Sequence, residues 1–326
     1  MKFSGTHSGG CHIMRQVFVL SAAAALTVAM AAAPALAADV PAPAEPAAPA
    51  APTQFDIAFG VKYTSNYGFR GISQSNGFGV AQGYAEAQFF DNFFYVNGFV
   101  SKVDLPTRAT AETDVGVGIR PKLGPLTFDL GFIQYGYPGE RRFMDPYNPV
   151  EYVTPAGAFY GPAILSPRNS EFGEVHASVS AAFNGLTVGA GVYHSWDFLG
   201  LGAPATYYNG TVKYTLPAEF LNGMKGNFYA SGELGYFQLG TTAARLGAVK
   251  LKSYTTWNIG AGYTYENLTV DLRYVDTDLS KKDCFLNSGD PAGFLNGGKS
   301  NWCSAAFVAT VSLDFTLSGL QQALAR

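Results

Sequence analysis

The sequence predicts an all-β protein, an antiparallel up-and-down transmembrane β-barrel of about 12 strands. Three observations support this fold class. Apolar and polar residues alternate with period two between Phe55 and Phe315, in segments of about ten residues. Short connections between these segments alternate with long ones. Aromatic residues make up 14% of the chain, and charged residues also only 14%, against roughly 25% in an average soluble domain.

The composition excludes several other classes of protein. The chain has 21 basic and 24 acidic residues, so it lacks the basic surplus of a nucleic-acid binder. Its 25 Phe and 19 Tyr argue against a disordered chain, which is poor in aromatic residues. Only one apolar run approaches the length of about 20 residues that a membrane-spanning helix needs, and it lies near the N-terminus.

This apolar run is typical of a cleaved signal peptide, which we place at residues 1–37. A short basic start at Met14 precedes the apolar residues 17–33, and small residues before Ala37 suit a signal peptidase, so cleavage is expected after Ala37. Met14 is an alternative start of the chain, and an uncleaved membrane anchor is the alternative interpretation. Residues 38–54 form a Pro/Ala-rich segment, interpreted as an extended periplasmic linker.

Segments with alternating residues follow along the rest of the chain. In 307–315, apolar residues such as Val311 share one face, whereas Thr310, Ser312 and Asp314 share the other. Strands of this length cross the hydrocarbon layer when tilted. The expected strands are 55–64, 79–90, 93–103, 112–121, 125–137, 170–183, 186–198, 205–216, 226–239, 252–265, 267–277 and 303–315. The barrel thus covers 55–315, and 316–326 is a C-terminal tail.

The connections support a membrane barrel. Every second one is short: 91–92, 122–125, 184–185, 266–267 and the somewhat longer 217–225. The others are long or irregular: 65–78, 104–111, 138–169, 199–204, 240–251 and 278–302. Short turns on one rim and long loops on the other are typical of a Gram-negative outer-membrane barrel, and an even strand number returns both termini to the periplasmic side.

Aromatic residues gather near the ends of the expected strands, as in the girdles that contact the two membrane interfaces. Tyr63, Tyr95, Tyr135, Tyr193 and Tyr207 are examples. A soluble β-sandwich or propeller is the alternative. However, the polar strand faces carry mainly small uncharged residues rather than many Lys and Glu, and the repeat of about 40 residues expected of a propeller is not seen.

Two cysteines, Cys284 and Cys303, lie in one loop-like stretch of the expected mature chain. Because disulfides form in the oxidising compartments that exported proteins reach, we predict a Cys284–Cys303 bridge in a surface loop. The alternative is two unpaired thiols. Asp residues around Cys284 could bind a divalent cation, but their spacing matches no calcium loop. No metal or cofactor is therefore expected.

The alternation assigns charged side chains to the lumen as candidates for lining a pore. Their near balance of signs predicts weak ion selectivity with a slight preference for cations. The alternative is that these charges pair across strands and fill the interior, which is of intermediate width in a barrel of about 12 strands. The candidates are Asp56, Lys62, Glu86, Lys102, Asp114, Arg120, Asp129, Glu174, Lys213, Glu233, Asp271, Arg273 and Asp314.

The long loop 138–169 is the expected constriction element. Folded inward, it would bring Arg141, Arg142 and Arg168 against the acidic side chains of the lumen. The alternative is an exposed, mobile cap.

A barrel that hydrolyses lipids is a competing class. His176 and Ser178 share a face with Glu174, which matches a catalytic triad by residue type. His194 and Ser195 are neighbours in a strand and must point to opposite faces. A polar lining of the lumen is the simpler interpretation of His176 and Ser178, and no enzyme activity is expected.

The stretch 63–75, YTSNYGFRGISQS, resembles the opening signature of the TorF family of porins, a proteobacterial outer-membrane family also catalogued as Gcw. Its motif residues here are Phe69, Arg70, Gly71, Ser73 and Gln74. Later segments resemble the family as well: 82–83, 112–118 and 302–303. The loop 138–169 and the tail 316–326 are longer than the family pattern. Arg70 is interpreted as a structural tie, with ligand binding as the alternative.

The resemblance implies an outer-membrane barrel with a pore role. We therefore expect a porin that lets small polar solutes or ions diffuse passively. The alternatives are a filled, non-conducting barrel that acts as a surface receptor or structural protein, and a lipid hydrolase. Expected partners are outer-membrane lipids and lipopolysaccharide, the barrel-assembly machinery, which reads an aromatic-ended strand such as 311–315, and the solutes. Nucleic acid is not expected, and association into homo-oligomers stays open.

Overall fold

The computed structural model describes residues 54–141, 144–154, 157–164, 169–217, 221, 223 and 225–325. The predicted signal peptide and almost all of the linker lie outside these residues. The long strands are β1 (Phe55–Thr64), β4 (Val80–Phe89), β5 (Phe94–Ser101), β6 (Glu112–Ile119), β8 (Leu126–Gly136), β11 (Phe172–Phe183), β12 (Leu186–Ser195), β13 (Ala205–Thr215), β14 (Asn227–Leu239), β15 (Tyr254–Tyr265), β16 (Leu268–Thr277) and β17 (Ala306–Thr316).

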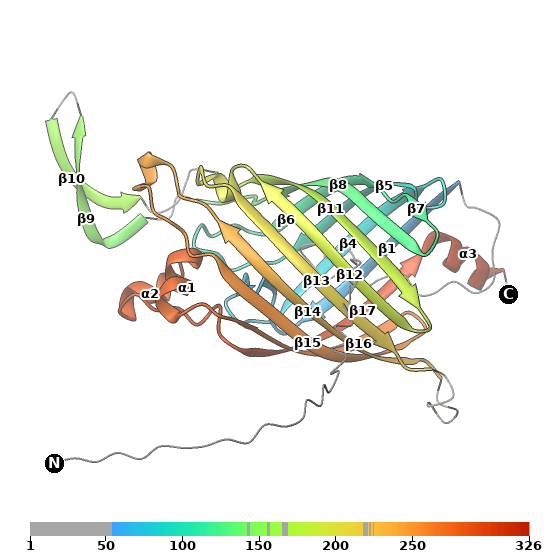
Figure 1. Ribbon diagram of the computed structural model, residues 1–326. Coiled ribbons are helices and arrows are strands. Elements are labelled where there is room, and N and C mark those ends of the chain that lie inside the picture. Colours follow the sequence, from blue (N-terminus) through green and yellow to red (C-terminus); the bar gives the residue numbers. More distant parts are fainter. Residues whose placement is uncertain are drawn as a thin grey trace, which may run out of the picture.

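These long strands form a closed antiparallel barrel (Figure 1). Each pairs with the next long strand along the chain, and β17 pairs with β1 to complete the ring. A short strand, β7 (Lys122–Leu123), adds to the β8 edge at a turn. Closure leaves no free strand edge, which a sheet in lipid requires. The prediction of a barrel of about 12 strands is confirmed.

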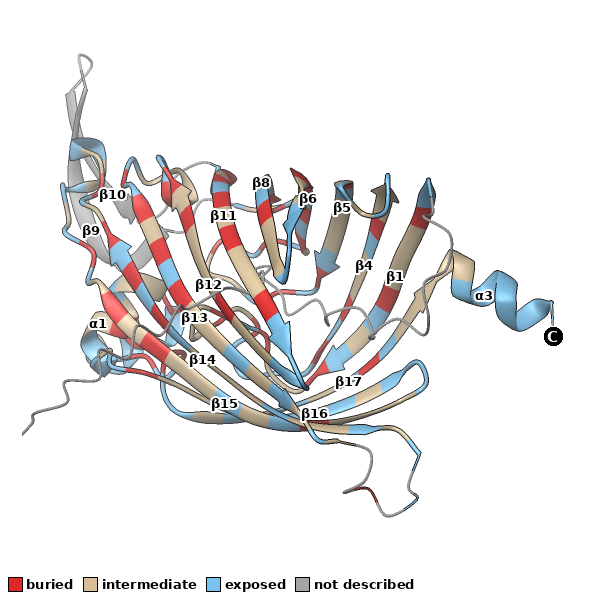
Figure 2. Ribbon diagram, turned by 45° about the vertical axis from the view of Figure 1, so that its right-hand side comes forward, coloured by how far each residue is buried: buried red, intermediate tan, exposed pale blue. Residues whose placement is uncertain are grey.

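Side chains alternate between the two faces of the wall, as Figure 2 shows by the alternation of buried and less buried segments. Along β6, Glu112 and Asp114 are buried, whereas Thr113 and Val115 are exposed. The outer face carries large apolar side chains such as Leu234 (60% exposed) and Ile259 (65% exposed). An exposed apolar surface of this extent is costly in water and favourable in lipid.

The connections differ between the two rims of the barrel (Figure 1). At one rim the turns are tight, as between β11 and β12, where Asn184 and Gly185 adopt positive φ angles of 46° and 83°. This backbone twist matches that of antiparallel strands and suits Asn-Gly. The longer connections lie at the other rim. We call the two ends the short-turn rim and the long-loop rim.

The tail after β17 is a helix, α3 (Leu317–Leu324), at the short-turn rim. The backbone amide and hydroxyl of Ser318 both donate to the Asp56 carboxylate, at 3.0 and 2.5 Å. Asp56 therefore ties the helix to the start of β1. Among the described residues, no helix is long and apolar enough to cross a membrane.

The segment 138–169 differs from the loop that the sequence predicts. It contains β9 (Met144–Thr154) and β10 (Gly157–Ile164), which pair with each other in a separate sheet. In Figure 1 this hairpin extends beyond the long-loop rim instead of entering the barrel. The fold therefore does not place the predicted inward constriction in this segment.

The segment between β16 and β17 forms a small cap at the long-loop rim. It contains α1 (Lys281–Ser288) and α2 (Pro291–Leu295), and the Cys284–Cys303 disulfide joins α1 to the residues before β17. The predicted bridge is confirmed. The disulfide and Trp302 pack against Ile72, Leu105 and Leu279, so the cap contacts the loops beside it.

Candidate functional site

The loop that follows β1 folds into the barrel at the long-loop end. It forms a tight hairpin of β2 (Gly68–Phe69) and β3 (Ile72–Ser73), with Arg70 and Gly71 at its tip. Gly71 has a φ of 83°, and a Cβ there would lie 2.4 Å from side-chain atoms of both Thr256 and Thr277. Only glycine combines this conformation with so close an approach to the wall. We call residues 66–75 the inner hairpin.

Arg70 joins the inner hairpin to the opposite wall. Its guanidinium makes two parallel hydrogen bonds to the Glu174 carboxylate of β11, at 2.7 and 2.8 Å. Their side chains are only 6% and 0% exposed. The guanidinium carbon also lies 4.6 Å from the ring centre of Tyr207 and 4.7 Å from that of Phe237. The planar ion fits a carboxylate fork and aromatic faces together, as lysine would not.

Aromatic residues of the wall pack around the inner hairpin. Phe69 meets the Tyr135 ring edge-on at 5.9 Å, and the Tyr254 hydroxyl donates to the Arg70 carbonyl oxygen at 2.9 Å. Tyr135 and Tyr193 are each only 1% exposed. The hairpin therefore forms part of an apolar core inside the barrel, which supports it over several strands.

Polar side chains of the motif stabilise the hairpin from within. Ser73 donates to the Asn66 side-chain oxygen at 2.6 Å, and Ser75 accepts from the Tyr67 amide at 2.9 Å. The Gln74 side chain donates to the Ile72 carbonyl oxygen at 3.1 Å. These bonds satisfy polar groups that the fold removes from water. The motif residues therefore build the hairpin, and Arg70 and Phe69 attach it.

Two groups of the hairpin have shifted pKa values. Burial and the neighbouring Glu112 carboxylate raise the pKa of Tyr67 well above its usual range, and the Tyr67 hydroxyl donates to Glu112. Burial alone would lower the pKa of Arg70, but the Glu174 carboxylate outweighs this effect and raises it. Tyr67 thus stays a neutral donor and Arg70 a cation at physiological pH.

A first charged network lines the wall toward the short-turn rim. Arg120 donates to Glu86 of β4 at 2.6 Å and to Asp129 of β8 at 2.9 Å. Asp129 also accepts from Tyr95 at 2.7 Å and contacts His176 Nε2 at 3.0 Å. The ion pairs of this network lie among the neighbouring strands β4 to β11.

A second network lines the wall from β13 to β16. Arg273 contacts Asp271 at 3.1 Å and donates to Asn258 and Ser231 at 2.5 and 2.9 Å. Glu233 accepts from Asn209 at 3.0 Å, and also from Tyr207. In both networks the charges pair with groups on the same stretch of wall. The wall is therefore polar, and both of its arginines pair with carboxylates.

The structure places the candidate lumen residues as follows. Most lie on the inner face, including Lys62 and the buried Asp114. Lys213 lies over the Tyr229 ring at 4.3 Å, and Asp314 accepts from Tyr84 at 3.0 Å. Their positions follow directly from the period of two.

Lys102 is an exception. It follows the end of β5, where the odd-numbered Tyr95 and Ser101 are buried. Lys102 shares the even parity of the exposed Val96 and is itself exposed. The assignment of Lys102 to the lumen is wrong. The parity of β5, continued past its last residue, places position 102 on the outer face.

Several tyrosines predicted for the membrane girdles also point inward. Tyr95, Tyr135, Tyr193 and Tyr207 are buried inside the barrel, at 1–3% exposure, whereas Tyr63 is exposed on the outside. The sequence position of these tyrosines indicates that they face inward. Tyr135, for example, is an even number of positions from Asp129 on the same strand, so both side chains point to the same face. Tyr95 lies near the short-turn rim, beside Arg120 and Asp129. Tyr135, Tyr193 and Tyr207 lie at the long-loop ends of their strands, where they contact Phe69 or Arg70 of the inner hairpin. Inward tyrosines at these three positions indicate that something fills that end of the lumen, and sequence reasoning missed this.

Of the three candidate constriction residues, only Arg141 lies within the described residues. It is exposed, and its backbone amide donates to the Thr107 carbonyl oxygen at 2.6 Å. Arg142 and Arg168 lie outside the described residues. The inner hairpin, rather than the loop that contains Arg141, folds into the barrel. The sequence predicts only a structural tie at Arg70 in this segment.

Comparison with known proteins identifies the family. A family model described as "Bacterial protein of unknown function (Gcw_chp)" matches residues 46–305. The chain belongs to the Gcw_chp family. The Gcw part of the predicted resemblance is confirmed, whereas the description of this family assigns no porin activity. No curated protein matches the chain.

Solved structures of other barrels resemble this member of the Gcw_chp family distantly. The KdgM porin is 11% identical and has a TM-score of 0.42, with 80% of this chain and 99% of that chain covered. OpdK of Pseudomonas aeruginosa with vanillate is 13% identical at a TM-score of 0.34, covering 73% and 57%. LpxR of Salmonella typhimurium is 9% identical at 0.34, covering 79% and 99%. Similarities this weak carry no inference about function.

The residues considered for hydrolysis do not form a triad in this Gcw_chp protein. His176 contacts Asp129, while Glu174 is occupied by Arg70. Within the described part of the chain, the Ser178 hydroxyl and His176 Nδ1 are buried without a hydrogen-bond partner. A nucleophile and its base must be within hydrogen-bond reach. This arrangement therefore does not support hydrolysis by these residues.

The acidic residues near the disulfide have structural contacts. Asp283 caps α1 together with Ser280, and Asp290 accepts from the Ala292 amide at the start of α2 at 2.9 Å. Asp278 accepts from the Thr255 amide at 2.9 Å. Among the described residues, no group of three or more His, Cys, Asp or Glu is placed to hold a metal ion.

Proposed function

We propose that this protein is an outer-membrane channel for passive diffusion of small polar solutes or ions, and that the inner hairpin forms its constriction. The observation that carries the proposal is the arrangement of charge in the barrel. The ion pairs of Arg120 and Arg273 run along two stretches of wall, whereas the hairpin enters the lumen and is held by the Arg70–Glu174 pair.

The outer surface supports the membrane location. Its exposed aliphatic side chains would be unfavourable in water and suit the hydrocarbon layer. Cleavage of residues 1–37 would leave the mature N-terminus in the periplasm, on the side of the short-turn rim. The long loops, the disulfide cap and the β9–β10 hairpin would then face the outside of the cell.

The polar wall explains how a solute would pass. A hydrated solute loses water ligands in a narrow lumen, and side chains such as Asn209, Asn258 and Ser231 can replace them. Because Arg120 and Arg273 each pair with carboxylates on the same stretch of wall, we expect the net field along the axis to be small. This predicts weak selectivity between cations and anions.

A closed barrel that acts as a surface receptor or structural protein is the second candidate. The specific observation in its favour is the apolar packing of Phe69 and Tyr67 against the wall, which fills the long-loop end of the lumen. The two candidates differ in whether the protein conducts and in whether release of the hairpin increases the conductance.

Single-channel conductance of the refolded protein in planar bilayers tests the proposal. Wild type should give discrete steps with weak ion selectivity. Arg70→Ala should give larger or longer steps, because it releases the hairpin from Glu174. Lys102→Ala, on the outer face, is the matched control and should leave the steps unchanged.

Folding of each variant would be checked by its heat-dependent shift on a gel. A variant lacking residues 68–73 provides a second arm, because it removes the constriction itself. If wild type, Arg70→Ala and this deletion are all folded and silent, the channel is rejected and the closed barrel is favoured.

A further inference from the structure

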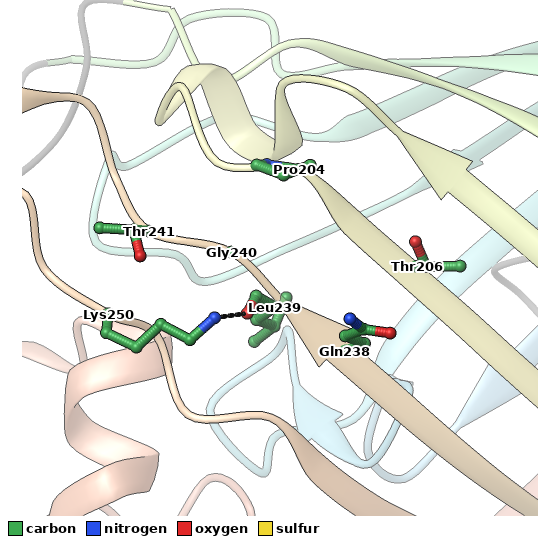
Figure 3. A pocket seen from close by; sticks show the side chains of 7 residues that line it. All are labelled: Pro204, Thr206, Gln238, Leu239, Gly240, Thr241 and Lys250. Atoms are coloured by element: carbon green, nitrogen blue, oxygen red, sulfur yellow. Dashed lines mark hydrogen bonds between the residues drawn. The ribbon is translucent and has the colours of Figure 1, made fainter.

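A polar pocket lies on the outer wall of the barrel at the long-loop rim (Figure 3). Its volume is about 330 Å³, and it is lined by the ends of β13 and β14 and by the loop after β14. Thr206 and Gln238 contribute from the strands, and Thr241 and Lys250 from the loop. Thr206 and Gln238 have the parity of exposed Tyr208 and Tyr236, so their side chains face outward, away from the lumen.

The pocket continues a polar row across three strands. His194 of β12 lies opposite Thr206, and Thr206 lies opposite Gln238. His194 Nδ1 and the Thr206 hydroxyl are 2.9 Å apart, and the exposed Trp196 ring meets the His194 ring edge-on at 5.0 Å. The row therefore combines hydrogen-bonding groups with an aromatic ring on the outer surface.

Below this row, the outer wall changes in character toward the middle of the barrel. The next row contains Tyr208 and Tyr236, which pair with each other and are 46% and 45% exposed. The row after it contains Leu234, at 60% exposure. Aliphatic, aromatic and then polar side chains follow one another, as hydrocarbon, interface and headgroups do in a membrane. The pocket thus lies at the level of the lipid headgroups.

The pocket carries a positioned positive charge. Lys250 donates to the Leu239 carbonyl oxygen at 2.6 Å, as Figure 3 shows, which holds the ammonium group at the pocket with two further donors. Exposed Lys252 and Arg245 on the same loop add positive charge. In the loop before β13, the Asp197 carboxylate accepts from the Gly202 amide at 2.5 Å. The chemistry of the site suits an anion attached to a hydroxyl-rich group.

We propose that this pocket binds the phosphorylated sugar headgroup of an outer-leaflet glycolipid, the lipid A part of lipopolysaccharide. Lys250 contacts the phosphate, Gln238 and Thr241 contact the sugar, and Tyr208 and Tyr236 lie against the start of the acyl chains. The proposal rests on the membrane orientation given above and is independent of whether the lumen conducts.

Binding of purified bisphosphorylated lipid A to the refolded full-length protein in detergent tests this site. Native mass spectrometry gives the number of bound lipids and their dissociation constants. Lys250→Ala should weaken the tightest lipid about tenfold, since a charge-assisted hydrogen bond is lost. Gln238→Ala should weaken it less, and Lys250→Arg should retain binding. Lys225→Ala, an exposed lysine at the short-turn rim, is the matched control and should bind as wild type does.

Two further ligands identify what is recognised. Lipid A without its phosphates should bind as weakly as Lys250→Ala binds the intact lipid. Inorganic phosphate should not compete at concentrations comparable to those of the lipid. The proposal is overturned if Lys250→Ala binds as wild type does, if Lys225→Ala loses as much affinity, or if the phosphate-free lipid binds equally well. Competition by inorganic phosphate alone would identify a free-anion site and also overturn it. The conductance of wild type tests the channel separately.

Discussion

At the residue scale, the Arg70–Glu174 pair is the contact whose loss should matter most for stability. Glu174→Ala leaves a guanidinium buried among aromatic rings without its carboxylate, and breaking a buried pair costs about 3–5 kcal/mol. Urea unfolding in lipid vesicles, followed by tryptophan fluorescence, measures this free energy.

The exposed Lys122–Asp91 pair, with side chains 58% and 67% exposed, provides the control for that measurement. Lys122→Ala should cause little measurable change, because solvent screens such pairs. Equal effects of the two substitutions would contradict a stabilising role of Arg70. The double substitution of Arg70→Met and Glu174→Leu should restore much of the stability that Glu174→Ala loses.

The same scale shows what single positions reveal in a sequence. Parity along a strand is a local property, so it placed residues such as Asp129 and Arg273 on the inner face. The partner of each charged side chain depends on the register between neighbouring strands. The sequence alone does not give this register. The inward tyrosines were misassigned because proximity to a strand end was given more weight than parity, as Tyr135 and Tyr193 illustrate.

At the scale of elements, the proposed constriction differs from the one that the sequence predicts. The sequence favoured 138–169 as the constriction because of its length and arginines, whereas the inner hairpin of 66–75 enters the lumen. Deleting residues 144–164 should therefore leave single-channel conductance within the variation of wild type. Deleting 68–73 should increase it several-fold. The reverse result would return the constriction to the longer segment.

The disulfide cap permits a second prediction at this scale. The Cys284–Cys303 bridge closes a loop whose helices α1 and α2 are short, so they depend on the bridge for their order. Cys284→Ser with Cys303→Ser should speed trypsin cleavage after the exposed Lys281 and Lys282. The barrel itself should keep its heat-dependent gel shift, since its strands pair independently of the cap. Unchanged cleavage would indicate that packing of Trp302 suffices.

At the scale of the whole molecule, the strands were predictable and the filling of the barrel was not. Strand length, hydrophobic period and turn length are determined by residues close together in the chain. Each expected segment therefore overlaps an observed strand, and ends such as Ser101 and Ala306 differ from the expected ones by a few residues. Inward folding of a loop depends on contacts with distant strands. The motif around Arg70 could be noticed as a pattern, but its partner, Glu174, lies 104 positions away.

The orientation of the barrel yields the last prediction. Both chain ends of the barrel lie at the short-turn rim, and an exported N-terminus remains in the periplasm. A cysteine in place of Arg245, in the exposed loop after β14, should thus react with a membrane-impermeant maleimide on intact cells. A cysteine in place of Lys225, at the short-turn rim, should react only after the outer membrane is permeabilised. Because Cys284 and Cys303, the two cysteines of the expected mature chain, are bonded to each other, the background should be low. If intact cells were labelled only at position 225, the barrel would have the opposite orientation in the membrane. The proposed lipid pocket would then not lie in the outer leaflet.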